Sequence, residues 1–420
     1  MKILLKQVTI ADPLSPHNGS IKDILISSGF IEKIDNSIED AGVAAVFTGV
    51  TVSPGWVDIF SHFCDPGFEY RETLESGAAA AAAGGYTRVF TIPNTNPGVQ
   101  SKSQVEYIVQ KSAALPVIMH PLGAVTKEIE GKELAEMYDM RSSGAIAFSD
   151  GIVPVQSAGL LLKALQYVKA FNGVIIQVPV DKSIGSHGLM NEGVVSTRLG
   201  LPGIPAIAEE LVIHRDLELL KYTGSKLHIT GVSTAKGLQQ IQAAKQAGLN
   251  VTCSVTPYHL FFCDENLQEY DTNLKVNPPL RTRADMEALR EGVRSGAVDC
   301  IATHHLPQNW DSKTCEFEYA KNGMIGLQTA FAVVNTAAPG LTASRVAQLF
   351  SVSARQIFNL PLATITEGVP AEMSLFAPAE PFTLEKTAIK SRSYNTPFTG
   401  MQLAGRVLAV VTKENIIVNK

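Results

Sequence analysis

Between residues 57 and 304 the sequence alternates eight short apolar runs with longer stretches of helical pattern. The runs cover residues 57–62, 88–92, 116–120, 145–148, 174–178, 226–231, 250–255 and 298–304. Continuous apolar runs of this length are typical of strands buried on both faces, and strands that alternate with helices form parallel sheets. Eight such units predict an α/β protein built on a (β/α)8 TIM-type barrel.

The two ends of the chain have a different pattern. Short β-like runs occur at 3–10, 21–27 and 29–34, and they return at 373–376, 407–411 and 415–418 after the alternation is lost beyond residue 351. We expect the C-terminal runs to complete the N-terminal sheet. The predicted organisation is therefore a barrel at 53–365 and a small composite β-domain formed by 1–52 and 366–420.

The composition excludes several classes of protein. Apolar residues make up 45% and charged residues 18% of the 420 residues, which is typical of a compact globular chain. A net charge of −5 without a Lys/Arg-rich run gives no basic field for nucleic acid. The five cysteines form no C-x-x-C pair, which favours a reducing compartment. Because no run of about 18 apolar residues and no signal-peptide pattern occurs, we expect a cytoplasmic protein with no membrane partner.

The first predicted barrel strand continues into a distinctive motif. Residues 53–67 read Ser-Pro-Gly-Trp-Val-Asp-Ile-Phe-Ser-His-Phe-Cys-Asp-Pro-Gly, so Phe60, His62 and Cys64 share one face. Five more segments are specific when taken together: Ile-Pro-Asn-Thr-Asn-Pro at 92–97, Met-Asn-Glu-Gly at 190–193, Val-Thr-Pro at 255–257, Lys-Val-Asn-Pro-Pro-Leu-Arg at 275–281 and Ser-Tyr-Asn-Thr-Pro-Phe at 393–398. On these segments the chain resembles the dihydroorotase branch of the amidohydrolases over almost its whole length.

The resemblance implies reversible ring opening between dihydroorotate and N-carbamoyl aspartate in active relatives, with water activated by one or two metal ions, usually zinc. It also implies ligands at positions 60, 62, 151, 178, 231 and 304, and an arginine at 64 that binds the substrate carboxylate. Only His62 is unchanged here. The other positions hold Phe60, Cys64, Gly151, Val178, Gly231 and His304. The chain thus looks like the non-catalytic dihydroorotase-like homologues that lack metal ligands, and we expect no cofactor.

The replacements agree with one another physically. Polar or charged groups clustered in a barrel mouth without a cation cost several kcal/mol each, on the order of the penalty for burying unpaired charges. Phe60, Gly151, Val178 and Gly231 remove such groups. The spacing of the segments is kept, which indicates substitutions on an intact scaffold.

Two sets of residues remain as candidates for a metal or for catalysis. His62 is the vestigial metal candidate, and with Cys64 and His304 it could hold a soft cation, although so few ligands make a poor site. If the chain is active, the catalytic candidates are His304 as a base and Asp150. The alternatives are a packed histidine and an aspartate that caps a loop.

Asn94 and Asn277 are the candidates for substrate binding. Both match family positions that contact substrate, but both also lie beside proline in loops where asparagine commonly fixes a turn. Four other histidines lie off the ligand positions and are expected to be structural: His120, His214, His228 and His259.

Three interpretations of function follow. The first is an inactive homologue of pyrimidine biosynthesis that acts as a structural partner of aspartate carbamoyltransferase, as the resemblance implies, and that forms a homo-oligomer. The second is an active dihydroorotase or other cyclic amidohydrolase with a site rebuilt around His62, Asp150 and His304. The third is a small-molecule sensor that uses Asn94 and Asn277.

Overall fold

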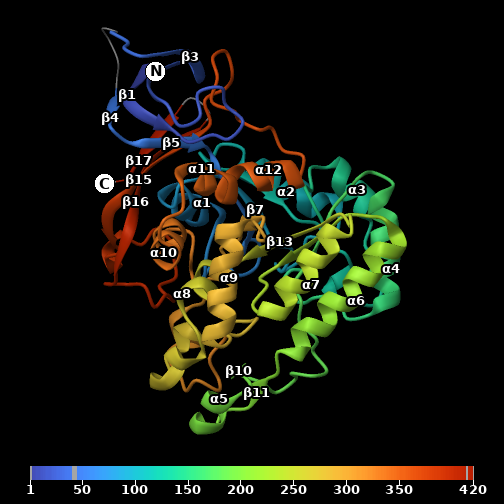
Figure 1. Ribbon diagram of the computed structural model, residues 1–420. Helices are drawn as coiled ribbons and strands as arrows, with labels where there is room; N and C mark the ends of the chain where they lie inside the picture. Colours follow the sequence, from blue (N-terminus) through green and yellow to red (C-terminus); the bar gives the residue numbers. More distant parts are fainter. Residues whose placement is uncertain (1, 40–44, 413–414, 420) are drawn as a thin grey trace.

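The computed structural model describes residues 2–39, 45–412 and 415–419, and its centre is a barrel of parallel strands (Figure 1). One part of the wall is formed by β6 (Trp56–Ser61), β7 (Tyr86–Thr91) and β8 (Ile118–Pro121), and the other by β9 (Ile175–Gln177), β12 (Leu227–Thr230), β13 (Val251–Val255) and β14 (Cys300–Ile301). Isolated β-bridges join the two parts. Phe148 bridges to Gly123 on one side and to Ile175 on the other, and Ser61 bridges to His305. The predicted α/β barrel fold is confirmed.

The fourth predicted strand, at 145–148, is reduced to the bridges of Phe148. The backbone N–H of Ala145 instead bonds to the Met140 carbonyl at 2.9 Å, in the turn that follows a short helix. The run still bonds to its neighbour, since Ile146 N–H donates to the Pro121 carbonyl at 3.2 Å and Gly123 N–H donates to the Ala147 carbonyl at 3.0 Å. It therefore remains part of the wall, although it forms isolated bridges and no regular strand. The strands predicted at 174–178 and 298–304 are also shorter than expected, since their last residues turn into the loops that carry the candidate site.

Helices pack around the barrel in the order expected for βα units. They are α1 (Leu74–Ala83), α2 (Lys102–Ser112), α3 (Met137–Ser142), α4 (Ala158–Lys169), α6 (Ile207–Thr223), α7 (Ala235–Gln246), α9 (Arg283–Ser295), α10 (Ala330–Ala337), α11 (Ala343–Ala347) and α12 (Ser353–Ile357). Helix α1 begins with a capping box in which Thr73 and Ser76 bond each other's backbone N–H. It ends before Gly84, which is its C-cap residue.

Shorter elements lie in the loops. The excursion after β9 contains β10 (Met190–Asn191), α5 (Val194–Leu199) and β11 (Gly203–Ile204), which project from the barrel (Figure 1). The other short helices and turns are α8 (Pro257–Phe261), η1 (Lys127–Ile129), η2 (Asp264–Glu269), η3 (Thr272–Leu274), η4 (Trp310–Ser312), η5 (Gln348–Val352) and η6 (Lys386–Ala388). Within the described ranges, the structure has no helix with the length and apolar character needed to span a bilayer.

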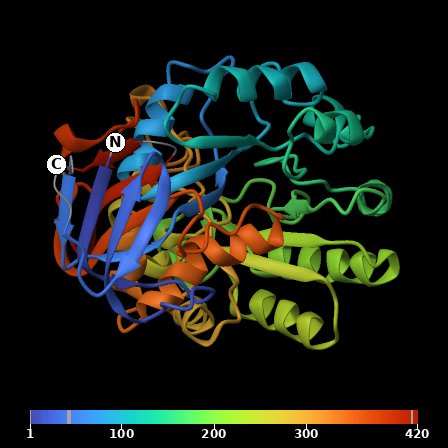
Figure 2. The same ribbon diagram turned by 90° about the horizontal axis from the view of Figure 1, so that it is seen from above.

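The two chain ends build one sheet beside the barrel. Its order is β17-β16-β15-β5-β1-β2-β3, with β4 also paired to β1. The strands are β1 (Lys2–Ile10), β2 (Ile21–Ser27), β3 (Phe30–Asp35), β4 (Ala45–Thr48), β5 (Thr51–Pro54), β15 (Met373–Thr383), β16 (Gln402–Thr412) and β17 (Asn415–Val418). Figure 2 shows the blue N-terminal and red C-terminal strands next to each other, and β15 pairs antiparallel with β5. The composite sheet is as predicted, while the domain boundaries remain predictions.

A buried carboxylate joins this sheet to the barrel. Glu372, directly before β15, accepts two hydrogen bonds of 2.9 Å from the Arg88 guanidinium on β7 and one of 2.5 Å from Arg355 in α12. Thr87 donates a further bond of 2.7 Å. Burial alone would raise the pKa of Glu372, but Arg355 and Arg88 outweigh burial and lower it to about 2. The ion-paired carboxylate therefore stabilises the contact between the two parts of the fold.

We predict that Glu372→Gln lowers the free energy of unfolding by about 3 kcal/mol, because it leaves two buried guanidinium groups without their counter-charge. In urea unfolding at neutral pH, Glu380→Gln is the matched control, since Glu380 pairs with Arg406 at the surface and its loss should cost less than about 1 kcal/mol. Equal losses in the two variants would contradict the prediction.

The same carboxylate predicts a pH dependence. Its folded-state pKa of about 2 is below the ordinary value of 4.5, so its contribution is fully present above pH 4.5 and is lost as the pH falls through 2. The difference in stability between the native chain and Glu372→Gln should therefore shrink on acidification through this window.

Candidate functional site

The residues predicted to form the site lie at one end of the barrel. His62 directly follows the end of β6, Asn94 follows β7, and Asp150 and Gly151 follow the Phe148 bridge. Val178, Gly231 and His304 come after β9, β12 and β14. All of these positions are at the carboxyl ends of the strands, where barrel proteins place their binding sites. The sequence therefore located the mouth of the barrel correctly.

The ring of His304 is packed on Phe60 across the mouth. The two ring centroids are 4.3 Å apart with an interplanar angle of 28°, and both residues are almost completely buried. His304 Nε2 lies 2.8 Å from the hydroxyl of Thr230 on β12. Burial lowers the pKa of His304 to about 3, so the ring is neutral at ordinary pH. His304 thus links three parts of the barrel wall as an uncharged, packed side chain.

The same ring fills the space beside Gly231. A Cβ at Gly231 would lie 2.7 Å from His304 Cε1, and Gly231 has a φ of +73°. His304 itself has a φ of +44°, in the left-handed region that residues with a Cβ rarely adopt. A histidine at 231 and the present His304 therefore exclude each other sterically.

Below His304, a chain of hydrogen bonds runs inside the barrel. Thr230 Oγ1 accepts a bond of 2.8 Å from Ser254, whose hydroxyl is 3.0 Å from His228 Nε2. His228 Nδ1 is 2.8 Å from the Thr252 hydroxyl. Burial lowers the pKa of His228 to about 3. His228 is thus a satisfied structural histidine, as its position off the ligand set predicted.

Asn94 takes the space in which a side chain at 151 would lie. Its amide donates to the Asp150 carbonyl at 3.1 Å, and its Oδ1 accepts from the Ile152 N–H at 3.1 Å. A Cβ built at Gly151 would overlap Asn94 Oδ1. Both polar atoms of the Asn94 amide are therefore engaged by the loop, which favours the structural alternative for this residue.

Asp150 is turned into the loop after β8. Its carboxylate accepts bonds of 2.9 Å from the Val125 and Thr126 N–H groups and of 2.6 Å from the Thr126 hydroxyl. Burial raises its pKa to about 6 against the lowering effect of these bonds. A carboxylate with three donors fixes the loop, so its geometry fits the capping role better than catalysis.

The remaining mouth positions are apolar or poorly supplied with partners. Val178 joins an apolar cluster with Phe60 and Leu306 inside the barrel. The Cys64 thiol is 3.6 Å from His62 Nδ1, and burial raises its pKa well above the usual value. Within the described part of the chain, His62 Nε2 and Asn277 Oδ1 are buried without a hydrogen-bond partner. Burial and the nearby charge of Arg71 lower the pKa of His62 to about 4.

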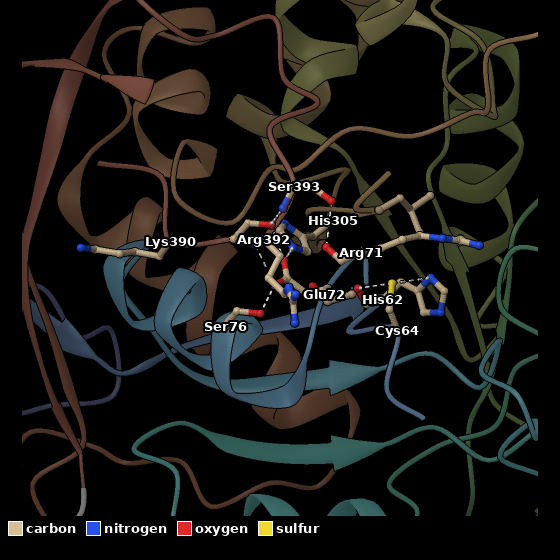
Figure 3. Close-up of polar contacts among 12 residues, drawn as sticks. His62, Cys64, Arg71, Glu72, Ser76, His305, Lys390, Arg392 and Ser393 are labelled. Carbon is tan, nitrogen blue, oxygen red and sulfur yellow. Dashed lines mark hydrogen bonds and ion pairs between the residues drawn. The ribbon is translucent and has the colours of Figure 1, made fainter. Parts of the chain in front are cut away.

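A polar cluster beside the mouth was not predicted from the sequence (Figure 3). Glu72 is buried and accepts hydrogen bonds from the Ser76 and Ser391 hydroxyls, from the Arg392 N–H and from His305 Nε2, which is 3.3 Å away. His305 Nδ1 accepts from the Gly326 N–H at 3.2 Å, so the Nε2–H tautomer fits the cluster. His305 thus points out of the barrel while His304 points in. Glu72 directly precedes the N-cap residue Thr73 of α1, and no local pattern distinguishes it from the neighbouring acids Glu69 and Glu75.

These side chains do not fit the zinc centre that the fold implies. Among residues 2–39, 45–412 and 415–419, no three His, Cys, Asp or Glu side chains are grouped so that they could hold a metal ion. A zinc site needs three or four protein ligands, usually supported by further hydrogen bonds. Here Phe60 and Val178 are apolar, and the spaces at Gly151 and Gly231 are filled by Asn94 and His304.

Solved structures with the same architecture include hydantoinases. An L-hydantoinase (dihydropyrimidinase) from Arthrobacter aurescens aligns with a TM-score of 0.88 and 21% identity, over 100% of this chain and 96% of that one. A D-hydantoinase aligns with a TM-score of 0.85 and 19% identity, over 100% and 95%. At this level of identity the likeness establishes the fold alone, the α/β barrel with a second sheet beside it.

Comparison of sequences identifies the family of the chain. A family model described as dihydro-orotase-like matches residues 49–237. The dihydroorotase of Syntrophus aciditrophicus (strain SB) is 39% identical over 99% of this chain and 99% of its own length. That of Thermoanaerobacter sp. (strain X514) is 39% identical over 99% and 97%. The chain therefore belongs to the dihydroorotase-like family.

We predict that Gly231→His destabilises the protein by about 3 kcal/mol or more, because overpacking against His304 adds to the cost of a side chain at positive φ. Gly248→His is the matched control, since Gly248 has a φ of +82° and nothing within 4 Å of an added Cβ. Thermal unfolding should show the larger loss at Gly231, and His304→Ala in the same chain should recover part of it. Equal losses at the two glycines would contradict the steric account.

We also predict that the purified protein contains no stoichiometric zinc, because His62 and His304 cannot supply three ligands. Elemental analysis after dialysis against excess zinc should give far less than one ion per chain, and a chelator should leave the melting temperature unchanged. One tightly held zinc per chain that is lost in His62→Ala would show that the mouth rearranges to form a site.

Proposed function

We propose that this chain is a dihydroorotase-like protein that does not hydrolyse dihydroorotate and serves as a structural partner of aspartate carbamoyltransferase in pyrimidine biosynthesis. The observation that carries the first part is the packing of the mouth, where His304 is stacked on Phe60 and fills the space at Gly231. Membership of the dihydroorotase-like family supports the assignment to pyrimidine biosynthesis. Its relatives are named dihydroorotases.

The side chains that could replace a metal-activated water are poorly suited to that task. His304 is neutral, buried and held against Thr230, and Asp150 is saturated by donors from its own loop. His62 Nε2 lacks a hydrogen-bond partner among the described residues, but its apolar surroundings lower its pKa and weaken it as a base. Cys64 cannot bind a substrate carboxylate as an arginine would. These features support the absence of ring hydrolysis.

The second part of the proposal rests on the resemblance and on the state of the mouth. A chain that keeps its fold without the usual chemistry can act through its outer surface, because function depends on sites and not on the fold as such. Stable interfaces bury on the order of 1,200–2,000 Å² in total, which a chain of 45.0 kDa can supply. An assembly role therefore needs no residue of the barrel interior.

Dihydroorotate turnover should be undetectable. Water has a pKa of about 15.7, against about 7 when bound to zinc, and the difference corresponds to roughly 12 kcal/mol for making hydroxide. The dihydroorotase of Syntrophus aciditrophicus, purified and assayed in parallel, is the positive control. Robust turnover that is abolished by His304→Ala would instead establish an enzyme with a rebuilt site.

We expect the chain to co-purify with aspartate carbamoyltransferase from the same organism at micromolar concentration. Because the proposed contact uses the outer surface, Phe60→Leu and Val178→Ala in the mouth should leave the complex intact. Analytical ultracentrifugation of the mixed proteins measures this directly. If the transferase assembles normally and does not bind this chain, the proposed structural role is wrong.

A further inference from the structure

Two segments that are far apart in sequence meet at the rim between the barrel and the composite sheet. Ser393 donates a hydrogen bond of 2.8 Å to the Arg71 carbonyl, and the Arg392 N–H donates one of 3.1 Å to Glu72. Figure 3 shows the Arg71 and Lys390 side chains on opposite sides of Glu72, each extending away from it, with Arg392 between them. The loop after β6 and the segment after β15 therefore form one continuous surface.

Four cations of these segments lack an acidic partner. Within the described residues, no carboxylate forms an ion pair with Arg71, Lys386, Lys390 or Arg392. The same segments contain four carboxylates: Asp65 is buried and pairs with Lys111, Glu72 is buried in the polar cluster, and Glu69 and Glu385 reach the surface. At the surface of these segments, cations therefore outnumber carboxylates by four to two, on a chain of net charge −5. We call this surface, completed by Tyr70 and Tyr394, the basic rim.

Two aromatic rings in the basic rim hold its cations in place. The Arg71 guanidinium lies 5.3 Å from the ring centroid of Tyr70, and Lys386 Nζ lies 5.5 Å from that of Tyr394. The two tyrosines are 57% and 53% exposed. Exposed tyrosine and arginine side chains of this kind are enriched in the energetically important parts of protein interfaces.

A cavity of about 690 Å³ adjoins the basic rim at Lys390. Helices α1 and α10 and strands β15 and β16 supply apolar walls, among them Ala79, Ala82, Phe331, Phe382 and Val407. It lies away from the barrel mouth, since it contains none of the candidate site residues. A cavity of this volume is large enough to enclose a big side chain and part of its backbone.

We propose that the basic rim and this cavity are a docking site for an acidic segment of a partner protein, with a large apolar side chain of that segment in the cavity. The excess of cations is complementary to carboxylates, and the apolar walls are complementary to an anchor residue. A phosphate or other small anion would use the cations but not the cavity. The docking site does not require the partner to be aspartate carbamoyltransferase. Failure of the acidic peptide to bind and failure of the transferase to bind are therefore distinguishable outcomes.

Fluorescence anisotropy with a labelled acidic peptide that carries one central phenylalanine tests the site. Lys390→Glu combined with Arg392→Glu should weaken binding by at least about tenfold, and added salt should weaken it further. The matched control is Lys102→Glu combined with Lys163→Glu, which changes the net charge equally at exposed positions on α2 and α4. This control should bind like the native chain.

A second variant tests the cavity. Ala79→Phe should reduce binding of the phenylalanine peptide to the level of a peptide with alanine at the centre, while a melting curve confirms that the variant is folded. The proposal is overturned if the native chain does not bind the peptide at concentrations on the order of 1 mM. It is also overturned if the rim and control variants bind equally, or if inorganic pyrophosphate binds at the rim and the peptide does not.

Discussion

The packing of the barrel mouth depends on one constraint: polar groups placed there need a partner, and the described side chains supply no cluster that could bring a metal ion to serve as one. For His304 the structure meets this constraint by stacking the ring on Phe60 and by placing Nε2 2.8 Å from the Thr230 hydroxyl, whereas His62 Nε2 has no partner among the described residues. The hydrogen bonds then continue through Ser254 to His228. The interior is thus filled by apolar rings and by a row of neutral, mutually satisfied polar groups.

The second organising contact lies between the barrel and the composite sheet. Glu372 joins β7 and α12 to the start of β15 through its two arginines. The same strand leads into the segment that contributes Lys390 and Arg392 to the basic rim. A buried charge network at the junction therefore fixes the base from which an exposed, charged surface is presented. The barrel mouth and the basic rim are stabilised by different interactions, so substitutions in the mouth can leave the basic rim unchanged.

The sequence predicted much of this arrangement and missed specific parts of it. The eight apolar runs predicted the barrel because buried parallel strands have a strong signal. The run at 145–148 forms isolated bridges in place of a regular strand, and the Ala145 N–H bonds to the Met140 carbonyl in α3. Pattern does not reveal which partner a backbone donor will choose.

The site was predicted in position more than in detail. That His304 lies in the mouth followed from its place at the end of a strand, but its stack on Phe60 and its contact with Gly231 depend on side-chain packing between distant strands. The role of Glu72 was missed because its partners Ser391 and Arg392 are more than 300 residues away in the chain. Contacts at such separation have no local signature.

The position of Asn94 has a consequence for how this barrel can change. Its amide holds the loop at Asp150 and Ile152, and its Oδ1 lies where a side chain at 151 would begin. An acidic residue at 151 would first have to displace Asn94, which would free two backbone groups before any benefit could arise. When two residues are in contact, the changes in stability caused by substituting each of them do not add. A single substitution at Gly151 therefore costs stability until the Asn94 side chain has moved, so a change at this position depends on the loop that Asn94 holds.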